Sequence, residues 1–346
     1  IQPMAALKFV SNYNVLLYTR HNNKGTPFEW GDGTDQFDAE ITAHYYDPVN
    51  KHIVVEFATP LTTIKENAFN GHFNTVIRDL RTMTLPNSLT TIGEDAFYLT
   101  GLVEFVCPGS VTYIGADAFY LCTQLKSVTF EPSPTNQPLA IECSDYAAPF
   151  SNGELTYINV NRAFKFMSGD EEVEPSMLRE GLFANAADVT YPTRIVIGEQ
   201  VPKIYNYMFA GLTMNKFDVP DHITEIGEGA FRGCPNITEF TIPATIESVG
   251  DDAFYGCTSL HTIRIEDSDK PLPMGYSYET LSAAEWGPFY ETPLKNIYMG
   301  RDIIQVDSDG REAEADQWDE GLFVNKHYEE EEMILNVEIG PKVTRI

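Results

Sequence analysis

The sequence predicts an α/β solenoid: a curved stack of about eleven rungs, with a parallel sheet on one face, short helical turns on the opposite face and an N-terminal β cap. Three regularities predict this fold. They are a recurring Phe, an apolar residue at a fixed distance before it, and a short period. The recurring residues are Phe69, Phe97, Phe119, Phe150, Phe183, Phe209, Phe231, Phe254, Phe289 and Phe323.

The spacing of these residues requires stacking. In six cases an apolar residue, usually followed by Pro or Gly, stands 12 residues before its Phe, and the regular stretches repeat every 22 or 23 residues. A unit of that length cannot bury a core by itself, so successive units must share one. The apolar landmarks, each at the end of an expected strand, are Phe57, Leu85, Cys107, Phe130, Val160, Ile197, Val219, Ile242, Ile265, Met299 and Ile339.

The strand of one rung is clearest around Ile242. Phe240 and Ile242 alternate with Thr241, which predicts a short strand with the two apolar side chains inward and Thr241 outward. Pro243 ends the strand because it has no N–H to donate to the next ladder position. Stacked copies of this strand form the expected parallel sheet.

The rest of the rung returns the chain to the next strand. Gly250 suggests a tight turn where a Cβ would obstruct. The segment 251–254, which is Asp-Asp-Ala-Phe, resembles the acidic start of a short helical turn. We therefore expect Phe254 to point inward and to stack on Phe231 of the preceding rung.

Four rungs are longer than the others, always between the strand and the Phe. Insertions confined to one place in a repeat emerge as loops along one edge, which is a frequent binding edge in solenoids. Residues 180–185 reappear almost unchanged as 320–325, which indicates a duplicated block within one continuous body. The long segments are 131–148, 161–181, 266–287 and 300–321.

Residues 1–52 lie outside the repeat and are assigned to the cap, because the open end of a solenoid needs covering. Apolar runs at 7–10 and 15–18 flank a turn and suggest a hairpin. Ile53–Phe57 is then expected to be the first parallel strand of a solenoid spanning 53–346. Because Ile346 falls in mid-repeat, the natural chain is expected to continue beyond it.

Composition narrows the classes of partner. The 346 residues are 43% hydrophobic and hold 23 basic against 51 acidic side chains, a formal charge of −28. Such a surface repels a phosphate backbone, which argues against a nucleic acid as the binding partner. No apolar run is long enough to span a membrane, and no secretion signal follows Ile1, so any signal has been removed or left out. Acidity also keeps an exported protein soluble, so it need not mark a binding site.

The five cysteines do not form a disulfide pattern. Cys122, Cys234 and Cys257 share the position three residues after the Phe, which is typical of a small buried apolar residue. Only Cys234 and Cys257, on consecutive rungs, could pair. The state of Cys143 is left open.

The repeating motif resembles the BspA-like leucine-rich repeat, a family of bacterial surface proteins of Bacteroides type. Its pattern, Ile-Pro-x-x-Ile-x-x-Ile-Gly-x-x-Ala-Phe-x-x-Cys-x-x-Leu, is matched almost position by position in 219–237 and 242–260. Residues 80–125 also match, with 99–101 departing at the Cys position, and residues 4–69 look like the cap of Bacteroides members. The resemblance implies a secreted or cell-surface protein, often an outer membrane lipoprotein anchored upstream of such a chain, and its founding members are adhesins that bind host matrix proteins. It carries no catalytic residues.

The residues themselves suggest no enzyme, cofactor or metal. The glycines of 227–233 resemble a phosphate loop but fall on the turn of the repeat. Residues 307–310 resemble the start of a calcium loop, but Arg311 stands where a third oxygen ligand is needed. Neither a zinc-protease His pair nor a serine nucleophile elbow occurs, and no pair of carboxylates is singled out for glycoside hydrolysis.

The expected function is therefore binding, with three alternatives open. The first is a surface scaffold that contacts a host or neighbouring-cell protein or a glycan through its outward strand positions, although such residues also keep an open sheet soluble. The second is an exported accessory to polysaccharide capture that uses aromatic rings of the long rungs, Tyr276, Tyr278, Trp286 and Trp318. The third is an envelope spacer without a specific ligand. The outward strand candidates are Thr84, Glu104, Val106, Thr129, Asp218, Glu239, Thr241 and Arg264.

Overall fold

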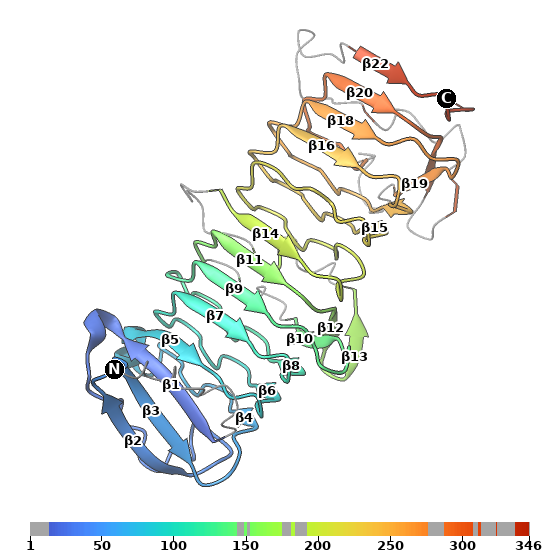
Figure 1. The fold of residues 1–346 in the computed structure, drawn as a ribbon. Coiled ribbons are helices and arrows are strands. Elements are labelled where there is room, and N and C mark those ends of the chain that lie inside the picture. Colours follow the sequence, from blue (N-terminus) through green and yellow to red (C-terminus); the bar gives the residue numbers. More distant parts are fainter. Residues whose placement is uncertain are drawn as a thin grey trace, which may run out of the picture. The chain divides into compact units, whose positions relative to one another are not determined.

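The computed structural model describes residues 14–143, 149–150, 153–174, 181–183, 192–275, 287–306, 311–312, 323 and 336–345. The chain forms two compact units, Ile1–Val173 and Glu174–Ile346, where the sequence favours one continuous body. Within the described residues, strands and turns dominate, and only two 3-10 helices occur, His21–Asn23 and Thr75–Asp79. Figure 1 shows the strands of each unit, coloured along the sequence.

An antiparallel sheet opens the N-terminal unit. Its strands, in spatial order, are β2 (Ile41–Asp47), β3 (His52–Phe57), β1 (Val15–Arg20) and β5 (Leu80–Thr84). Because β3 runs antiparallel to both β1 and β2, the expectation that Ile53–Phe57 is the first parallel strand is wrong. An unbroken apolar run such as Ile-Val-Val can be buried in either kind of sheet, so the pattern did not decide the direction of pairing. Residues 7–10 of the expected hairpin lie outside the described residues.

Two parallel sheets follow in the N-terminal unit, because each rung supplies one strand to each. The longer strands are β7 (Glu104–Cys107), β9 (Ser127–Phe130) and β11 (Tyr157–Val160). The second sheet holds β4 (Thr63–Ile64), β6 (Thr91–Ile92), β8 (Tyr113–Ile114), β10 (Leu139–Glu142) and β12 (Phe164–Ser168), and ends in the antiparallel β13 (Glu171–Val173). Figure 1 shows the two rows of strands in this unit.

The C-terminal unit repeats this two-sheet arrangement after β14 (Arg194–Ile197). One sheet contains β16 (Glu239–Ile242), β18 (Thr262–Ile265), β20 (Asn296–Met299) and β22 (Asn336–Ile339). The other contains β15 (Glu225–Ile226), β17 (Ser248–Val249), β19 (Leu272–Gly275) and β21 (Ile303–Val306). The expected parallel strands are therefore present, but in two sheets instead of one.

The expected helical turns are absent from the described Phe segments, and the hydrogen bonds explain why. The backbone N–H of Phe231 donates to the carbonyl of Ala253 on the next rung at 2.8 Å, and Gly229 and Gly233 donate to Asp251 and Tyr255 at 2.7 Å. These donors are thus unavailable for bonds within a helix. Residues two before and two after the Phe also take left-handed φ angles, such as 53° at Asp252 and 66° at Gly256, which no right-handed helix contains. The turns form an interlocked ladder.

The Phe side chains form the core, as expected. Phe231 and Phe254 are 0% exposed, and their rings are stacked at 5.5 Å with 7° between planes. The stack continues to Phe289 at 5.3 Å. In the N-terminal unit the rings of Phe97 and Phe119 are stacked at 5.0 Å. One in-register column per unit therefore links successive rungs.

The cysteines of the repeat are buried beside this column. The thiols of Cys122, Cys234 and Cys257 donate to the carbonyl of the Phe on the preceding rung at 3.0, 3.2 and 3.1 Å. Burial raises the pKa of Cys122 to about 11 and that of Cys257 to about 12. All five cysteines are free, so the alternative of a Cys234–Cys257 disulfide is wrong.

Two arginines are buried in a matching way, which sequence reasoning missed. Arg162, 0% exposed, donates to the carbonyls of Val111 at 2.8 Å and Gln137 at 3.1 Å. Arg301, 1% exposed, donates to the carbonyls of Ile246 at 2.8 Å and Pro243 at 2.9 Å. Each guanidinium satisfies carbonyls of earlier rungs in its own unit. Arg301 is therefore a structural residue, although it lies in one of the long segments.

The long segments are not simple edge loops. They contain β10, β12, β19 and β21, which are strands of the second sheets. Most of the residues that could form such an edge, 276–286, 307–310 and 313–322, lie outside the described residues.

Gly250 permits the close approach of neighbouring rungs, and its substitution should be costly. A Cβ there would lie nearer to the backbone nitrogen of Glu228 than real Cβ contacts do. Backbone cannot move aside as a side chain can, so we expect Gly250→Ala to lower the free energy of unfolding by about 3 kcal/mol. Gly233→Ala is the control, because its Cβ meets nothing and only its φ of 66° is unfavourable, at about 1–2 kcal/mol. Urea unfolding of both variants checks this, and equal losses would contradict the close-packing account.

The buried thiols should be unreactive towards thiol reagents in the native protein. A thiolate forms with difficulty in an apolar interior, so Cys107, Cys122, Cys234 and Cys257 should not react with a thiol reagent until the protein unfolds. Cys143, which is half-buried, should react first. Mass spectrometry of timed labelling reactions reads out each site. Rapid native labelling of Cys122, Cys234 and Cys257 would show that the repeat position does not face the core.

Candidate functional site

The structure places the side chains of the eight outward strand candidates at the solvent-facing side of the chain. Seven are exposed and Thr129 is half-buried. The register brings Val106 beside Thr129 in the N-terminal unit, and Thr241 beside Arg264 in the C-terminal unit. It does not bring all eight together, because Thr84, Glu104, Val106 and Thr129 belong to one unit and Asp218, Glu239, Thr241 and Arg264 to the other. Their role in binding stays a prediction.

The most ordered part of this surface lies on the sheet β16–β18–β20–β22. The register aligns Thr241, Arg264, Tyr298 and Glu338 in one outward row. The guanidinium carbon of Arg264 sits 3.9 Å from the centre of the Tyr298 ring, a cation–π contact. The Tyr298 hydroxyl donates to Asp267 at 2.7 Å, and this bond raises the pKa of the phenol. Both side chains are thereby held in one orientation at the surface.

A second row beside it is polar, and hydrogen bonds link three of its members. Glu239, Thr262, Asn296 and Asn336 are aligned by the same register. The Asn336 amide donates to Asn296 at 2.8 Å, and the Asn296 amide donates to the Thr262 hydroxyl at 3.3 Å. The two rows form what we call the amide–aromatic face, consisting of these eight residues.

Sequence reasoning missed Tyr298, Thr262 and Asn296, although a signal for them was present. The candidates were chosen one or three residues before an apolar landmark, as Thr241 and Glu239 are before Ile242. The same rule applied to Ile265 and Met299 gives Thr262, Asn296 and Tyr298. The aromatic candidates Tyr276, Tyr278, Trp286 and Trp318 lie outside the described residues.

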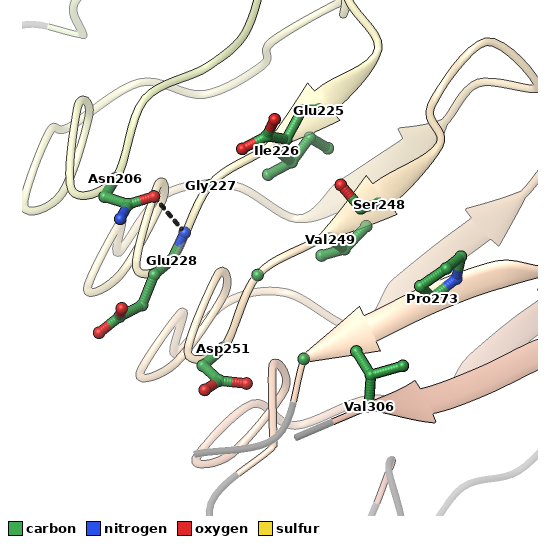
Figure 2. Close-up of a pocket in the computed structure, with 12 residues that line it drawn as sticks. Asn206, Glu225, Ile226, Gly227, Glu228, Ser248, Val249, Asp251, Pro273 and Val306 are labelled. Carbon is green, nitrogen blue, oxygen red and sulfur yellow. Dashed lines mark hydrogen bonds between the residues drawn. The ribbon is translucent and has the colours of Figure 1, made fainter. Parts of the chain in front are cut away.

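The other sheet of the C-terminal unit carries a shallow hollow, shown in Figure 2. Its volume is about 270 Å³. Gly227, Gly250 and Gly275, at the ends of three successive strands, contribute only backbone to it. We call it the glycine trough, with the remaining lining residues being Asn206, Glu225, Ile226, Glu228, Ser248, Val249, Asp251, Pro273 and Val306.

Acidic groups dominate the electrostatics of the glycine trough. Glu225 is paired with Lys203 at 3.1 Å, outside the lining. Glu228 accepts a hydrogen bond from the Tyr207 hydroxyl at 2.6 Å, and its backbone N–H donates to Asn206 at 3.0 Å. Burial, and then the bond to Glu228, raise the pKa of Tyr207. These contacts fix the positions of two carboxylates, and the Lys203 ammonium offsets the charge of Glu225.

A perturbed carboxyl occurs on the turns of the N-terminal unit. Asp95 stands two residues before Phe97 and has a φ of 52°. Burial raises its pKa to about 6, helped by the negative charges of Asp117 on the next rung and of Glu94. Asp95 is therefore an ionisable group placed by the repeat itself.

Neither metal chemistry nor membrane spanning is indicated by the described part of the chain. Among those residues, no group of three or more His, Cys, Asp or Glu side chains is arranged to hold a metal ion. No helix found there is long and apolar enough to cross a membrane.

The raised pKa of Asp95 predicts a pH-dependent stability. When the pKa of an acid is higher in the folded than in the unfolded state, protonation of that acid stabilises the fold. This stabilisation is full at low pH and is lost as the pH rises from about 4 through about 6. Asp95→Asn keeps a residue that tolerates positive φ but removes the charge. The variant should therefore be more stable than the wild type at pH 8, with the difference shrinking towards pH 4. Glu104→Gln, on an exposed strand position, is the control in urea titrations, and a pH-independent effect of Asp95→Asn would contradict the prediction.

The chain is similar to solved structures at low sequence identity. The pneumococcal vaccine antigen PcpA is 18% identical, with 74% of this chain and 71% of that chain covered and a TM-score of 0.32. A leucine-rich repeat protein from Bacteroides ovatus is 15% identical, with 80% and 75% covered and a TM-score of 0.37. A leucine rich cell surface protein from Faecalibacterium prausnitzii is 18% identical, with 78% and 61% covered and a TM-score of 0.31. No curated protein matches the sequence.

The family is shown by the repeat itself. The model of the BspA type leucine rich repeat region matches residues 40–169 and 178–309, with six copies. These two stretches make up more than half of the 346 residues. The break between them falls where the two compact units meet in the sequence. The resemblance drawn from the motif is thus confirmed, and the chain belongs to the BspA-type leucine-rich repeat family.

Proposed function

We propose that this chain is a non-enzymatic binding and adhesion scaffold at the cell surface, which recognises a host or neighbouring-cell protein or a glycan. Membership of a leucine-rich repeat family supports the scaffold, because such repeats build extended surfaces from small units. In this proposal the protein is secreted or held at the outer membrane by a lipid anchor upstream of the chain. It uses no cofactor.

The observation that carries this proposal is the amide–aromatic face. Arg and Tyr are the residue types that most often dominate binding energies, and here they are stacked at 3.9 Å. The neighbouring bonds from Asn336 to Asn296 and from Asn296 to Thr262 hold the polar groups in place. Ordered side chains lose less entropy when a ligand binds, so such a face is suited to recognition.

The N-terminal sheet is proposed to act as the cap of a stack of about eleven rungs. Phe69, the first member of the Phe column, is covered by Trp30 at 5.3 Å and by Phe37 at 5.7 Å between ring centres. The Asp38 carboxylate also accepts hydrogen bonds from the backbone N–H groups of Thr62 and Thr63. The cap, placed by the sequence in residues 1–52, extends in this proposal through β3 to Phe57, and the rest of the chain is the solenoid.

The proposal predicts where ligand binding fails. The protein is first assayed against a panel of host matrix proteins and a glycan array. For any ligand found, Arg264→Ala and Tyr298→Ala should each weaken binding about 10- to 30-fold, because each removes one half of the stacked pair. Arg78→Ala in the N-terminal unit is the control for loss of one positive charge.

Three outcomes separate the alternatives. Binding that both substitutions leave unchanged, in folded variants, would remove the amide–aromatic face from the proposal. Ligands found only on the glycan array would favour polysaccharide capture. No ligand on either panel would favour an envelope spacer and contradict the proposed function.

A further inference from the structure

The glycine trough is not used by the function proposed above. It lies on the sheet β15–β17–β19–β21, whereas the amide–aromatic face lies on the other sheet of the same unit. Figure 2 shows Glu225, Ser248 and Pro273 on successive strands, with Glu228 and Asp251 on the turns that follow. The outward positions of these strands are half-buried, so a partner can reach them.

The shape of the trough limits the size of what it can hold. The three successive glycines contribute only backbone to the lining. A volume of about 270 Å³ is slightly below the range of about 300–1,000 Å³ that is usual for small-molecule pockets. The trough therefore fits one long side chain of a partner better than it fits a metabolite.

The charge of the trough selects the side chain. The lining holds three acids, Glu225, Glu228 and Asp251, and no Lys or Arg. Lys203, outside the lining, pairs with Glu225 alone of these three, so the trough keeps a net negative charge. Ser248 and Asn206 add polar groups. The chain as a whole carries a formal charge of −28, so the surrounding field also attracts cations.

We propose that the glycine trough docks a basic, extended segment of a protein partner, with an arginine side chain lying in the trough. A guanidinium offers five N–H donors in one plane, which lets a single group serve several separate acceptors. Its long aliphatic stem can lie along backbone and the Pro273 and Val306 side chains. The proposal rests on the proposed function only in taking the partner to be a protein.

The test uses a defined probe and not an unknown partner. A labelled peptide that alternates glycine and arginine is titrated with the whole chain and followed by fluorescence anisotropy, beside a peptide with glutamine in place of arginine. We expect the arginine peptide alone to bind, and to bind less tightly as salt rises from about 0.01 M to about 0.15 M.

Two triple variants with the same change in charge locate the site. Glu225→Gln, Glu228→Gln and Asp251→Asn, combined, should weaken binding of the peptide at least 10-fold (about 1.4 kcal/mol). Glu29→Gln, Glu154→Gln and Asp221→Asn, combined, remove three exposed acids outside the trough and outside the amide–aromatic face, and should change it less than twofold. Ser248→Lys places an ammonium group of the chain itself in the trough. It should weaken peptide binding as strongly as the first triple variant does.

Each failure has its own meaning. No binding of the arginine peptide by the wild type overturns the proposal, as does equal loss in the two triple variants, which would show attraction by the overall charge alone. Arg264→Ala, which alters only the amide–aromatic face, should leave peptide binding intact. Failure of the trough is thereby told apart from failure of the proposed function.

Discussion

The hydrogen-bonded ladder between successive Phe turns is the constraint on which the rest of the structure depends. Each turn donates its N–H groups to the next, as Phe231 does to Ala253 at 2.8 Å. The ladder fixes the distance between rungs, which sets the ring spacing in the Phe column and the close approach at Gly250. It also brings each buried thiol within reach of the preceding Phe carbonyl. Outward residues are aligned for the same reason, because a stack in strict register repeats every side-chain position.

How much of this was predictable differs between the core and the surface. The Phe column, the buried cysteines and the inward–outward alternation of β16 follow from spacing alone, because burial leaves a period in the sequence. The direction of pairing of Ile53–Phe57 left no such trace, since an apolar run suits either direction. The turn around Phe254 was expected to be helical because Asp-Asp-Ala-Phe suits a helix start. Bonds to the next rung, which local sequence cannot report, decided otherwise.

The candidate site was predictable only in part. The outward rule located Arg264 and Thr241 but was not extended to Tyr298, so the stacked pair was missed. The glycine trough depends on Gly227, Gly250 and Gly275 lying on neighbouring rungs, and the repeat explains those glycines by packing alone. The burial of Arg162 and Arg301 could not be foreseen, because the carbonyls that they bind come from earlier rungs, distant in the sequence. A lone Arg beside acidic residues is far more often exposed.

The central claim is that the Phe turns are bonded to each other and are not helices. Scalar coupling across hydrogen bonds, measured by NMR on the deuterated protein, tests it most directly because the coupling identifies both partners. The account predicts a coupling between the amide nitrogen of Phe231 and the carbonyl carbon of Ala253. A coupling from Phe231 to the carbonyl carbon of Gly227, four residues earlier, is what a helical turn would give, and it would contradict the account.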